Sequence, residues 1–204
     1  MQEYFAIEKK ENKFVLSKQD LFQISTVLRM RQNDHIVVTF EKEKYDCVVS
    51  FLRKEVEITI DHKLDVNNEL DVEITLVYGL PKKDKFEMVV QKATELGVTK
   101  IVPFEAKRSV SLLNSDNVSK KLERWNMIAK EASEQSKRNI KVEVVNPVKL
   151  KEILNYKGEL NIVPYEELNS EGTTTLYNLL DKKPGSDNDI DIDDVKFSND
   201  LFDK

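Results

Sequence analysis

A strand–helix–strand pattern between Val72 and Val110 constrains the fold of this chain more than any other stretch. β-Branched residues recur at alternate positions from Val72 to Val77, which is typical of a strand, and Gly79-Leu80-Pro81 ends it. Asp84 is spaced to cap the helical pattern that follows. Gly97 supplies the left-handed stop that ends many helices, and a second apolar run comes directly after it. The stretch therefore predicts a βαβ unit with two parallel strands and a right-handed crossover.

The N-terminal part predicts a small β-rich module. Three runs of strand character, residues 35–40, 45–51 and 55–60, are joined by short loops. Such a meander is most economically closed as a small β-barrel. Ser17 and Asp20 are spaced to cap a short helix before it. We expect one domain at 1–66, followed by a polar boundary segment.

Strands and helices continue to alternate after the βαβ unit. A long helix is expected from residue 115 to about 138, with Trp125 as its apolar anchor. A strand at 141–145, a short helix at 148–155, a strand at 160–164 and a helix at 174–180 follow. This order predicts an α/β domain at 72–183, with a mostly parallel sheet covered by helices.

Composition excludes several classes of site. The chain has one cysteine, Cys47, and two distant histidines, so we expect no disulfide, no metal site and no Ser/His triad. Cys47 lies in a β-like run, where it should act as a buried small apolar residue. No apolar run reaches membrane-spanning length and no signal peptide is recognisable, which leads us to expect a cytoplasmic protein.

The last residues, 184–204, differ in composition from the rest. Residues 186–204 hold seven Asp and two Lys, so this segment carries the whole net charge of −5. We expect it to be a disordered acidic tail rather than a calcium loop, because the glycine and the distal glutamate of such a loop are absent. The remaining chain is neutral overall, and its acidic pI does not argue against binding nucleic acid.

Several basic and polar residues are candidates for contact with a ligand. Arg29 and Arg31 end the first helix, where they could bind phosphate or only complement the helix dipole. The loop containing Lys82, Lys83 and Lys85 follows the first strand of the βαβ unit, where open α/β sheets bind ligands, although it could also be solvated surface. One face of the long helix is predicted to carry Arg124, Glu131, Gln135 and Arg138. A charged stripe of this kind is often only a solvated face.

The order of specific residues goes further than composition. The segments VLR (27–29), LPKKDKFEMVVQKATELGV (80–98), RSV (108–110) and RWNMIAKEASEQSKR (124–138) together resemble the ribosomal RNA small subunit methyltransferase E family. The resemblance extends from the N-terminus to about Glu167. It implies transfer of a methyl group from S-adenosylmethionine to N3 of a uridine in 16S rRNA.

The resemblance also implies structure and partners. It predicts a PUA-like RNA-binding β-barrel at the N-terminus and a SPOUT-type α/β domain with a trefoil knot. It further implies a homodimer and places 16S rRNA of the small ribosomal subunit as the partner. The matched positions that we expect to contact RNA or the substrate are Arg108, Arg124, Glu131, Gln135 and Arg138, together with Arg29, Arg31, Lys82, Lys83 and Lys85.

Two motifs that the family carries late in the chain do not occur in this sequence. They are a Gly-Pro-Glu-Gly-Gly loop and an Ile-Leu-Arg-Thr-Glu-Thr-Ala segment, which make most of the cofactor pocket. We therefore expect a C-terminally incomplete domain that binds S-adenosylmethionine weakly or not at all. We also expect apolar surface to be uncovered near the strands at 98–103 and 160–164. The alternative function is that of a non-catalytic RNA-binding member of the family.

Overall fold

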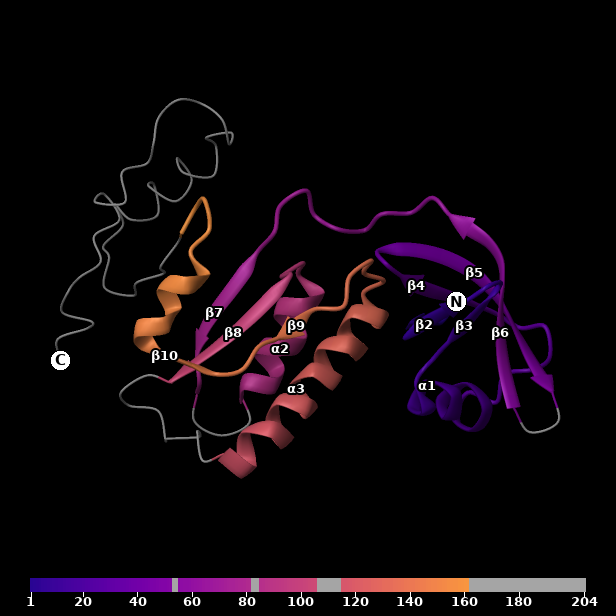
Figure 1. Ribbon diagram of the computed structural model, residues 1–204, viewed down its shortest axis with the longest axis horizontal. Coiled ribbons are helices and arrows are strands. Elements are labelled where there is room, and N and C mark those ends of the chain that lie inside the picture. Colours follow the sequence, from indigo (N-terminus) through magenta and orange to yellow (C-terminus); the bar gives the residue numbers. More distant parts are fainter. Residues whose placement is uncertain (53–54, 82–84, 106–114, 162–204) are drawn as a thin grey trace. The chain divides into compact units, whose positions relative to one another are not determined.

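The computed structural model describes residues 1–52, 55–81, 85–105 and 115–161 (Figure 1). The chain divides into two compact units, residues 1–156 and 157–204. Of the second unit only residues 157–161 are described, and there the side chain of Asn161 closes a turn by accepting a hydrogen bond from the amide of Gly158 at 3.0 Å. The predicted helix at 174–180, most of the predicted strand at 160–164, and the segment expected to form the C-terminal knot and the acidic tail lie outside the described residues.

The N-terminal part of the first unit is a mixed six-stranded sheet. Its strands are β1 (Glu3–Phe5), β2 (Glu8–Lys10), β3 (Lys13–Val15), β4 (His35–Phe40), β5 (Glu43–Leu52) and β6 (Glu55–Leu64). They follow the order β1-β4-β5-β6-β3-β2, in which β1 and β4 are parallel and all other neighbours are antiparallel. The β4-β5-β6 meander is the one that the sequence predicts. The strand pairs of the described chain make a sheet and do not by themselves close it into a barrel.

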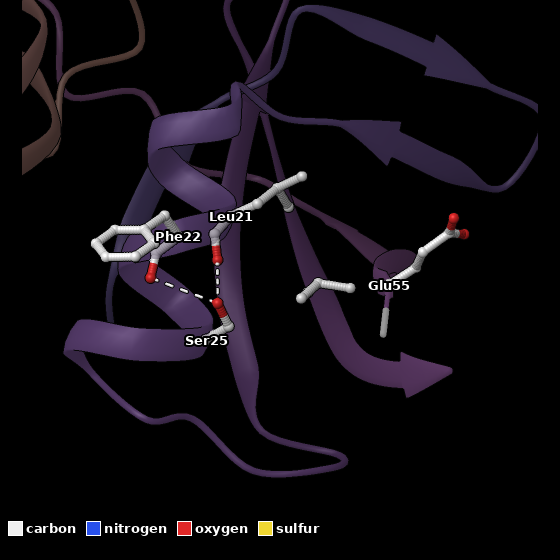
Figure 2. A pocket seen from close by; sticks show the side chains of 5 residues that line it. Leu21, Phe22, Ser25 and Glu55 are labelled. Carbon is white, nitrogen blue, oxygen red and sulfur yellow. Dashed lines mark hydrogen bonds between the residues drawn. The ribbon is translucent and has the colours of Figure 1, made fainter. Parts of the chain in front are cut away.

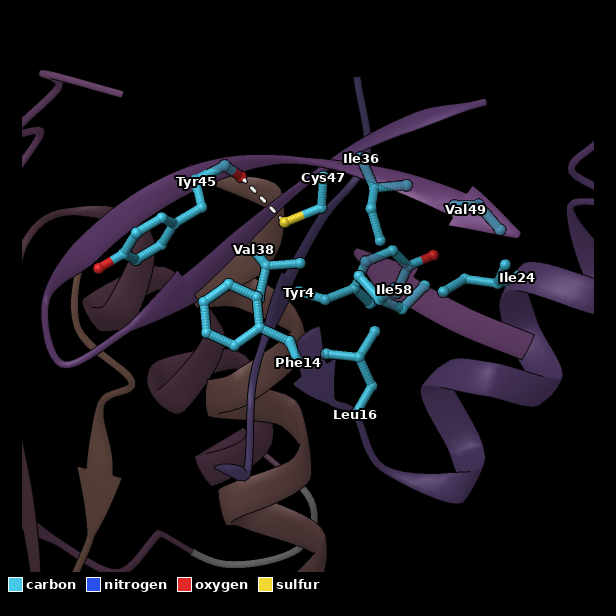
Figure 3. Packing of buried hydrophobic residues seen from close by; sticks show 10 residues of the cluster. All are labelled: Tyr4, Phe14, Leu16, Ile24, Ile36, Val38, Tyr45, Cys47, Val49 and Ile58. Carbon is cyan, nitrogen blue, oxygen red and sulfur yellow. Dashed lines mark hydrogen bonds between the residues drawn. The ribbon is translucent and has the colours of Figure 1, made fainter. Parts of the chain in front are cut away.

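The alternating pattern of these strands places one set of side chains in a single apolar core. Figure 3 shows it: Tyr4, Phe14, Leu16, Ile24, Ile36, Val38, Tyr45, Cys47, Val49 and Ile58. The ring of Phe14 meets that of Tyr45 edge-on at a centroid distance of 5.1 Å, a favourable arrangement for aromatic pairs. Cys47 is fully buried, as predicted, and burial raises the pKa of its thiol to about 12, which leaves it an unreactive core residue.

A capped helical segment lies between β3 and β4. α1 (Lys18–Phe22) continues directly into the π-helix η1 (Gln23–Val27). Ser17 is the N-cap: its Oγ accepts a hydrogen bond from the amide of Asp20 at 3.1 Å and donates one to the Asp20 carboxylate at 2.6 Å. The predicted cap of this helix by Ser17 and Asp20 is therefore confirmed, while the change to π-helical geometry left no signal in the residue periodicity.

The βαβ unit is also confirmed. β7 (Thr75–Gly79), α2 (Lys85–Glu95) and β8 (Lys100–Glu105) follow each other, and β7 pairs with β8 in parallel. Gly97 has φ of +104°, the left-handed conformation that stops α2, and a Cβ there would lie 2.6 Å from Leu70 Cδ1. No residue other than glycine fits this position without moving its surroundings.

The long helix α3 (Ser115–Gln135) packs on α2 over the second core. Trp125 is its anchor, as predicted, and meets Phe86 of α2 edge-on at 4.7 Å between ring centroids. The short strands β9 (Glu143–Val144) and β10 (Val148–Lys149) both pair with β8 in parallel, and the 3-10 helix η2 (Leu150–Tyr156) follows. The parallel sheet with helices is thus confirmed for the described residues.

Two details differ from the sequence prediction. The segment expected to be a helix at 148–155 begins as strand β10 and continues as 3-10 helix, because its first residues pair with Phe104 and Glu105 of β8. The expectation of uncovered apolar surface is wrong for the strand at 98–103, because Ile101 and Val102 are fully buried. Near the strand expected at 160–164, Leu160 is 43% exposed, and residues 162–164 lie outside the described chain.

The Gly97 geometry generates a stability prediction. The Gly97→Ala substitution should lower the free energy of unfolding by more than about 1 kcal/mol, because alanine disfavours this φ and its Cβ would overlap Leu70. Urea denaturation measures the loss. Gly158→Ala is the matched control, since the nearest atom to its new Cβ is 3.8 Å away. Equal stability of the two variants would contradict the conclusion that Gly97 needs its left-handed conformation and its close contact with Leu70.

A second prediction concerns His35 on β4, whose Nδ1 lies 2.6 Å from Asp46 Oδ1 on β5. This hydrogen bond raises the pKa of His35 above its ordinary value of 6.5. The stabilisation is therefore complete below about pH 6.5 and is lost as pH rises through the raised pKa. The parent should be slightly more heat-stable than His35→Gln at acidic pH, and thermal melts should coincide at alkaline pH. A difference in melting temperature between the parent and His35→Gln that grew as pH rose would refute this prediction.

Candidate nucleic-acid interface

The carboxyl ends of β7 and β8 form the edge at which the sequence places its basic loop. Gly79 ends β7. The ring of Phe104, near the end of β8, occupies the space beside Gly79: its Cζ lies 3.2 Å from the position that a Cβ on residue 79 would take. Lys85, the first residue of α2, is exposed at this edge. Lys82 and Lys83 of the same predicted loop lie outside the described residues, as does Arg108, which the family resemblance places in contact with RNA or the substrate.

One exposed face of α3 carries three of the predicted residues. Arg124, Glu131 and Gln135 are all exposed and follow each other at steps of seven and four residues, so they share one side of the helix. The guanidinium of Arg124 reaches α2, where it contacts both carboxylate oxygens of Glu87 at 2.6 and 2.8 Å. Since 63% of the Arg124 side chain is exposed, the pair is accessible to solvent and can exchange Glu87 for another anion.

Arg138 does not belong to this face. Lys137 has φ of +57° and ends the helical path, so the next side chain turns inward. Arg138 is buried, forms an ion pair with Glu69, and donates through Nη1 to the carbonyl oxygens of Thr94, at 3.2 Å, and Val98. All its donor groups thus face protein atoms, and its placement gives no support to a contact with RNA.

Arg29 and Arg31 lie on the N-terminal module, directly after the π-helix. Both side chains are exposed. Arg29 has φ of +52°, an uncommon conformation for arginine, and the amide of Arg31 donates to the carboxylate of Asp34 at 2.6 Å. The backbone around these arginines is therefore held in a defined turn while their charged ends remain in solvent.

A hollow of about 430 Å³ lies on the same module (Figure 2). It is lined by Leu21, Phe22, Ser25, Glu55 and Val56. Ser25 Oγ donates to the carbonyl oxygen of Leu21 at 2.8 Å, which uses its hydroxyl within the helix. The remaining lining offers one carboxylate and apolar groups, a set with no evident preference for an anionic ligand.

Sequence reasoning missed a buried charged cluster between α1 and α3. Lys130 Nζ lies 2.6 Å from Asp20 Oδ1 and 2.8 Å from Glu134 Oε1, and Glu134 accepts from the amide of Phe5 at 3.2 Å. Burial raises the pKa of Glu134, only partly offset by Lys130. Burial alone would lower the pKa of Lys130, but its hydrogen bonds to the two carboxylates leave it raised. The i, i+4 spacing of Lys130 and Glu134 predicts only their mutual contact, since Asp20 is 110 residues away.

Other classes of site find no support in the described chain. No group of three or more metal-ligating side chains occurs among the residues that the structure describes. Within the same residues, no helix is long and apolar enough to cross a membrane. What the described chain offers instead is a set of exposed cations on two folded modules.

Comparison with known proteins decides the family. The sequence profile of the RNA methyltransferase domain matches residues 68–190. A ribosomal RNA small subunit methyltransferase E of Bacillus subtilis is 32% identical over 189 residues, which cover 88% of this chain and 74% of the relative. This chain belongs to the ribosomal RNA small subunit methyltransferase E family. The same enzyme of Mesomycoplasma hyopneumoniae is 34% identical, and the match covers 76% of this chain and 66% of that one.

Solved structures agree with the family assignment. The methyltransferase E of Neisseria gonorrhoeae, solved with S-adenosylmethionine, has a TM-score of 0.68 at 27% identity, covering 78% of this chain and 66% of that one. A methyltransferase of Legionella pneumophila, also solved with this cofactor, has a TM-score of 0.75 at 25% identity, covering 83% and 72%. S-Adenosylmethionine is therefore the cofactor found in structures of the methyltransferase E family.

The described residues alone do not fit that cofactor. At the edge formed by β7 and β8, Phe104 fills the space beside Gly79, and Leu80 is buried. Residues 82–84, 106–114 and 162–204, which flank or follow this edge in sequence, lie outside the described chain. Among the described residues, this edge thus presents the apolar side chains of Phe104 and Leu80.

The ion pairs Arg124–Glu87 and Arg138–Glu69 should contribute differently to the stability of the fold. Arg138→Ala should lower the free energy of unfolding by about 3–5 kcal/mol, because it leaves the carboxylate of Glu69 buried without its cation. Arg124→Ala removes an exposed pair and should cost less than about 1 kcal/mol. Urea denaturation compares them. Equal losses, or an Arg138→Ala variant of parental stability, would refute the structural role of Arg138.

Proposed function

We propose that this chain methylates N3 of a uridine in 16S rRNA of the small ribosomal subunit, with S-adenosylmethionine as methyl donor. The observation that carries this proposal is the 32% identity over 189 residues to a ribosomal RNA small subunit methyltransferase E. That match covers 88% of the chain, so it extends over residues of both sheets. The function places the protein in the cytoplasm, where the ribosome is assembled.

The chemistry defines what the protein must do. N3 of uridine carries a weakly acidic proton that has to leave as the methyl group arrives. When bound, the cofactor supplies an activated methyl group. The protein has to extrude the base, hold it in line with that group and stabilise negative charge at N3. These are tasks of positioning and electrostatics, for which preorganised cations and hydrogen-bond donors are suited.

Exposed cations support the RNA-binding part of the proposal. Arg29 and Arg31 on the N-terminal module, and Lys85 and Arg124 on the α/β part, all have their charged ends in solvent. Phosphate contacts dominate the affinity of such interfaces. Glu131 and Gln135 share the Arg124 face, so a nucleotide held there would meet a carboxylate and an amide as well. Arg138 is left out of this set because its guanidinium is buried.

The same proposal assigns different roles to the N-terminal and C-terminal parts of the chain. Residues 1–66 would hold RNA as a PUA-like module, closed as a barrel, and residues 72–183 would form the SPOUT-type methyltransferase domain. Polar contacts of α3 with Asp20 and Phe5, and of Lys137 just after α3 with Lys44, support a fixed relation between the two within the first unit. The knot and a homodimer remain predictions of the family resemblance.

Methyl transfer tests the proposal directly. The purified chain, small-subunit RNA and radiolabelled S-adenosylmethionine should yield 3-methyluridine, identified by nuclease digestion and chromatography. Calorimetric titration with the cofactor tests our separate expectation of weak binding. If the chain binds the RNA, does not bind the cofactor and does not form 3-methyluridine, it is the non-catalytic RNA-binding alternative. Binding of neither would refute both functions.

A further inference from the structure

A second hollow, of about 310 Å³, lies where the six-stranded sheet meets the segment that leaves α3. Three parts of the first unit line it: the ends of β1 and β4, the two-residue turn at 41–42, and residues 139–141. We call this hollow the joint groove. None of the residues predicted from the sequence to bind RNA lines it.

Partly buried hydrogen bonds hold the walls of the joint groove in place. The Asn139 side chain donates to the carbonyl oxygens of Lys42 and Val66, both at 2.9 Å. The amide of Ile140 donates to Glu69 Oε1 at 3.0 Å, and that of Phe5 donates to Glu134 Oε1 at 3.2 Å. Each wall is thus tied to another element, so the groove is formed before any ligand arrives.

The lining combines an apolar floor with a rim that carries two lysines and the exposed carboxylate of Glu41. Phe5, Phe40 and Ile140 are half-buried and supply ring and aliphatic surface. Lys42 and Lys141 are exposed on two different walls, and neither has an ion-pair partner among the residues that the structure describes. Aromatic floor with flanking cations is the combination with which proteins hold single-stranded nucleic acid.

Backbone strain marks the same place. Glu41 and Lys42 form the β4–β5 turn with φ of +50° and +67°, a conformation that glycine and asparagine normally supply. Strained backbone of this kind tends to gather at ligand-binding sites, where the surroundings maintain it. Here the hydrogen bond from Asn139 to the Lys42 carbonyl is such a restraint.

We propose that the joint groove holds one unpaired base of the RNA substrate, with the phosphates on either side against Lys42 and Lys141. The proposal rests on the proposed function, which brings RNA to this chain. The volume is at the lower end of ligand pockets and suits a single base. A base in a duplex has its faces stacked on neighbours, so the groove selects single-stranded RNA.

The experiment measures RNA affinity by fluorescence anisotropy with a labelled single-stranded 12-nucleotide RNA that contains uridine, across a range of salt concentrations. Lys42→Ala/Lys141→Ala should weaken binding about tenfold or more at low salt. It should also reduce the slope of log affinity against log salt by about 1.4, since each lost phosphate contact contributes about 0.7. Lys18→Ala/Lys151→Ala is the matched control, because it removes two exposed lysines that do not line the groove.

A second variant tests the floor separately. Ala6→Leu places a larger side chain in the groove without changing charge, and should weaken binding about fivefold or more while leaving the salt slope unchanged. The duplex form of the same RNA should be insensitive to it. Thermal melts equal to the parent's confirm that each variant is folded, and the lysine pair carries the test if Ala6→Leu does not fold.

The outcomes separate this proposal from the function on which it rests. If the parent methylates small-subunit RNA and binds the oligonucleotide, but the groove variants bind like the parent, the joint groove is refuted alone. Equal weakening by the control lysines refutes it too, because net charge would then explain the effect. If the parent neither binds RNA nor transfers a methyl group, both proposals fall.

Discussion

The carboxylate of Glu69 is the contact on which the arrangement of the first unit depends. One oxygen accepts hydrogen bonds from the backbone amides of Asn139, at 2.6 Å, and Ile140, at 3.0 Å, and the other pairs with the guanidinium of Arg138. Arg138 in turn binds carbonyl oxygens at the end of α2. A residue from the segment between the two sheets thereby ties together the ends of both helices. Backbone groups that would otherwise be buried without partners are satisfied by these two side chains.

Further polar contacts join α3 and the residues just after it to the N-terminal part of the unit. Lys44, although only 2% exposed, donates to the carbonyl oxygen of Lys137 at 2.7 Å and pairs with Glu3 at 2.8 Å. Lys130 and Glu134 extend the same pattern towards Asp20 and Phe5. Hydrogen bonds have demands on distance and angle that apolar contacts lack, so they define one relative position of sheet and helix.

Much of this architecture could be predicted because it is local. The N-cap at Ser17 and the βαβ unit, whose helix stops at Gly97, each depend on residues within about thirty positions, and periodicity or spacing reveals them. The role of Arg138 could not be predicted from the α3 face, because one left-handed residue, Lys137, redirects it and its partner lies 69 residues earlier. The Lys130 cluster was missed for the same reason. Sequence reasoning found the cations on the surface and did not recognise the ones that hold the interior together.

The turn at Glu41 and Lys42 has a consequence for the order in which the chain folds. Neither residue adopts a left-handed backbone readily, so an isolated β4–β5 hairpin would close its turn less often than one built on asparagine and glycine. The hydrogen bond that restrains this turn comes from Asn139, 97 residues later. Closing so long a loop is slow compared with forming a hairpin. The N-terminal meander should therefore reach its final geometry only after α3 has been synthesised and docked, which makes this early-synthesised sheet a late-maturing part of the protein.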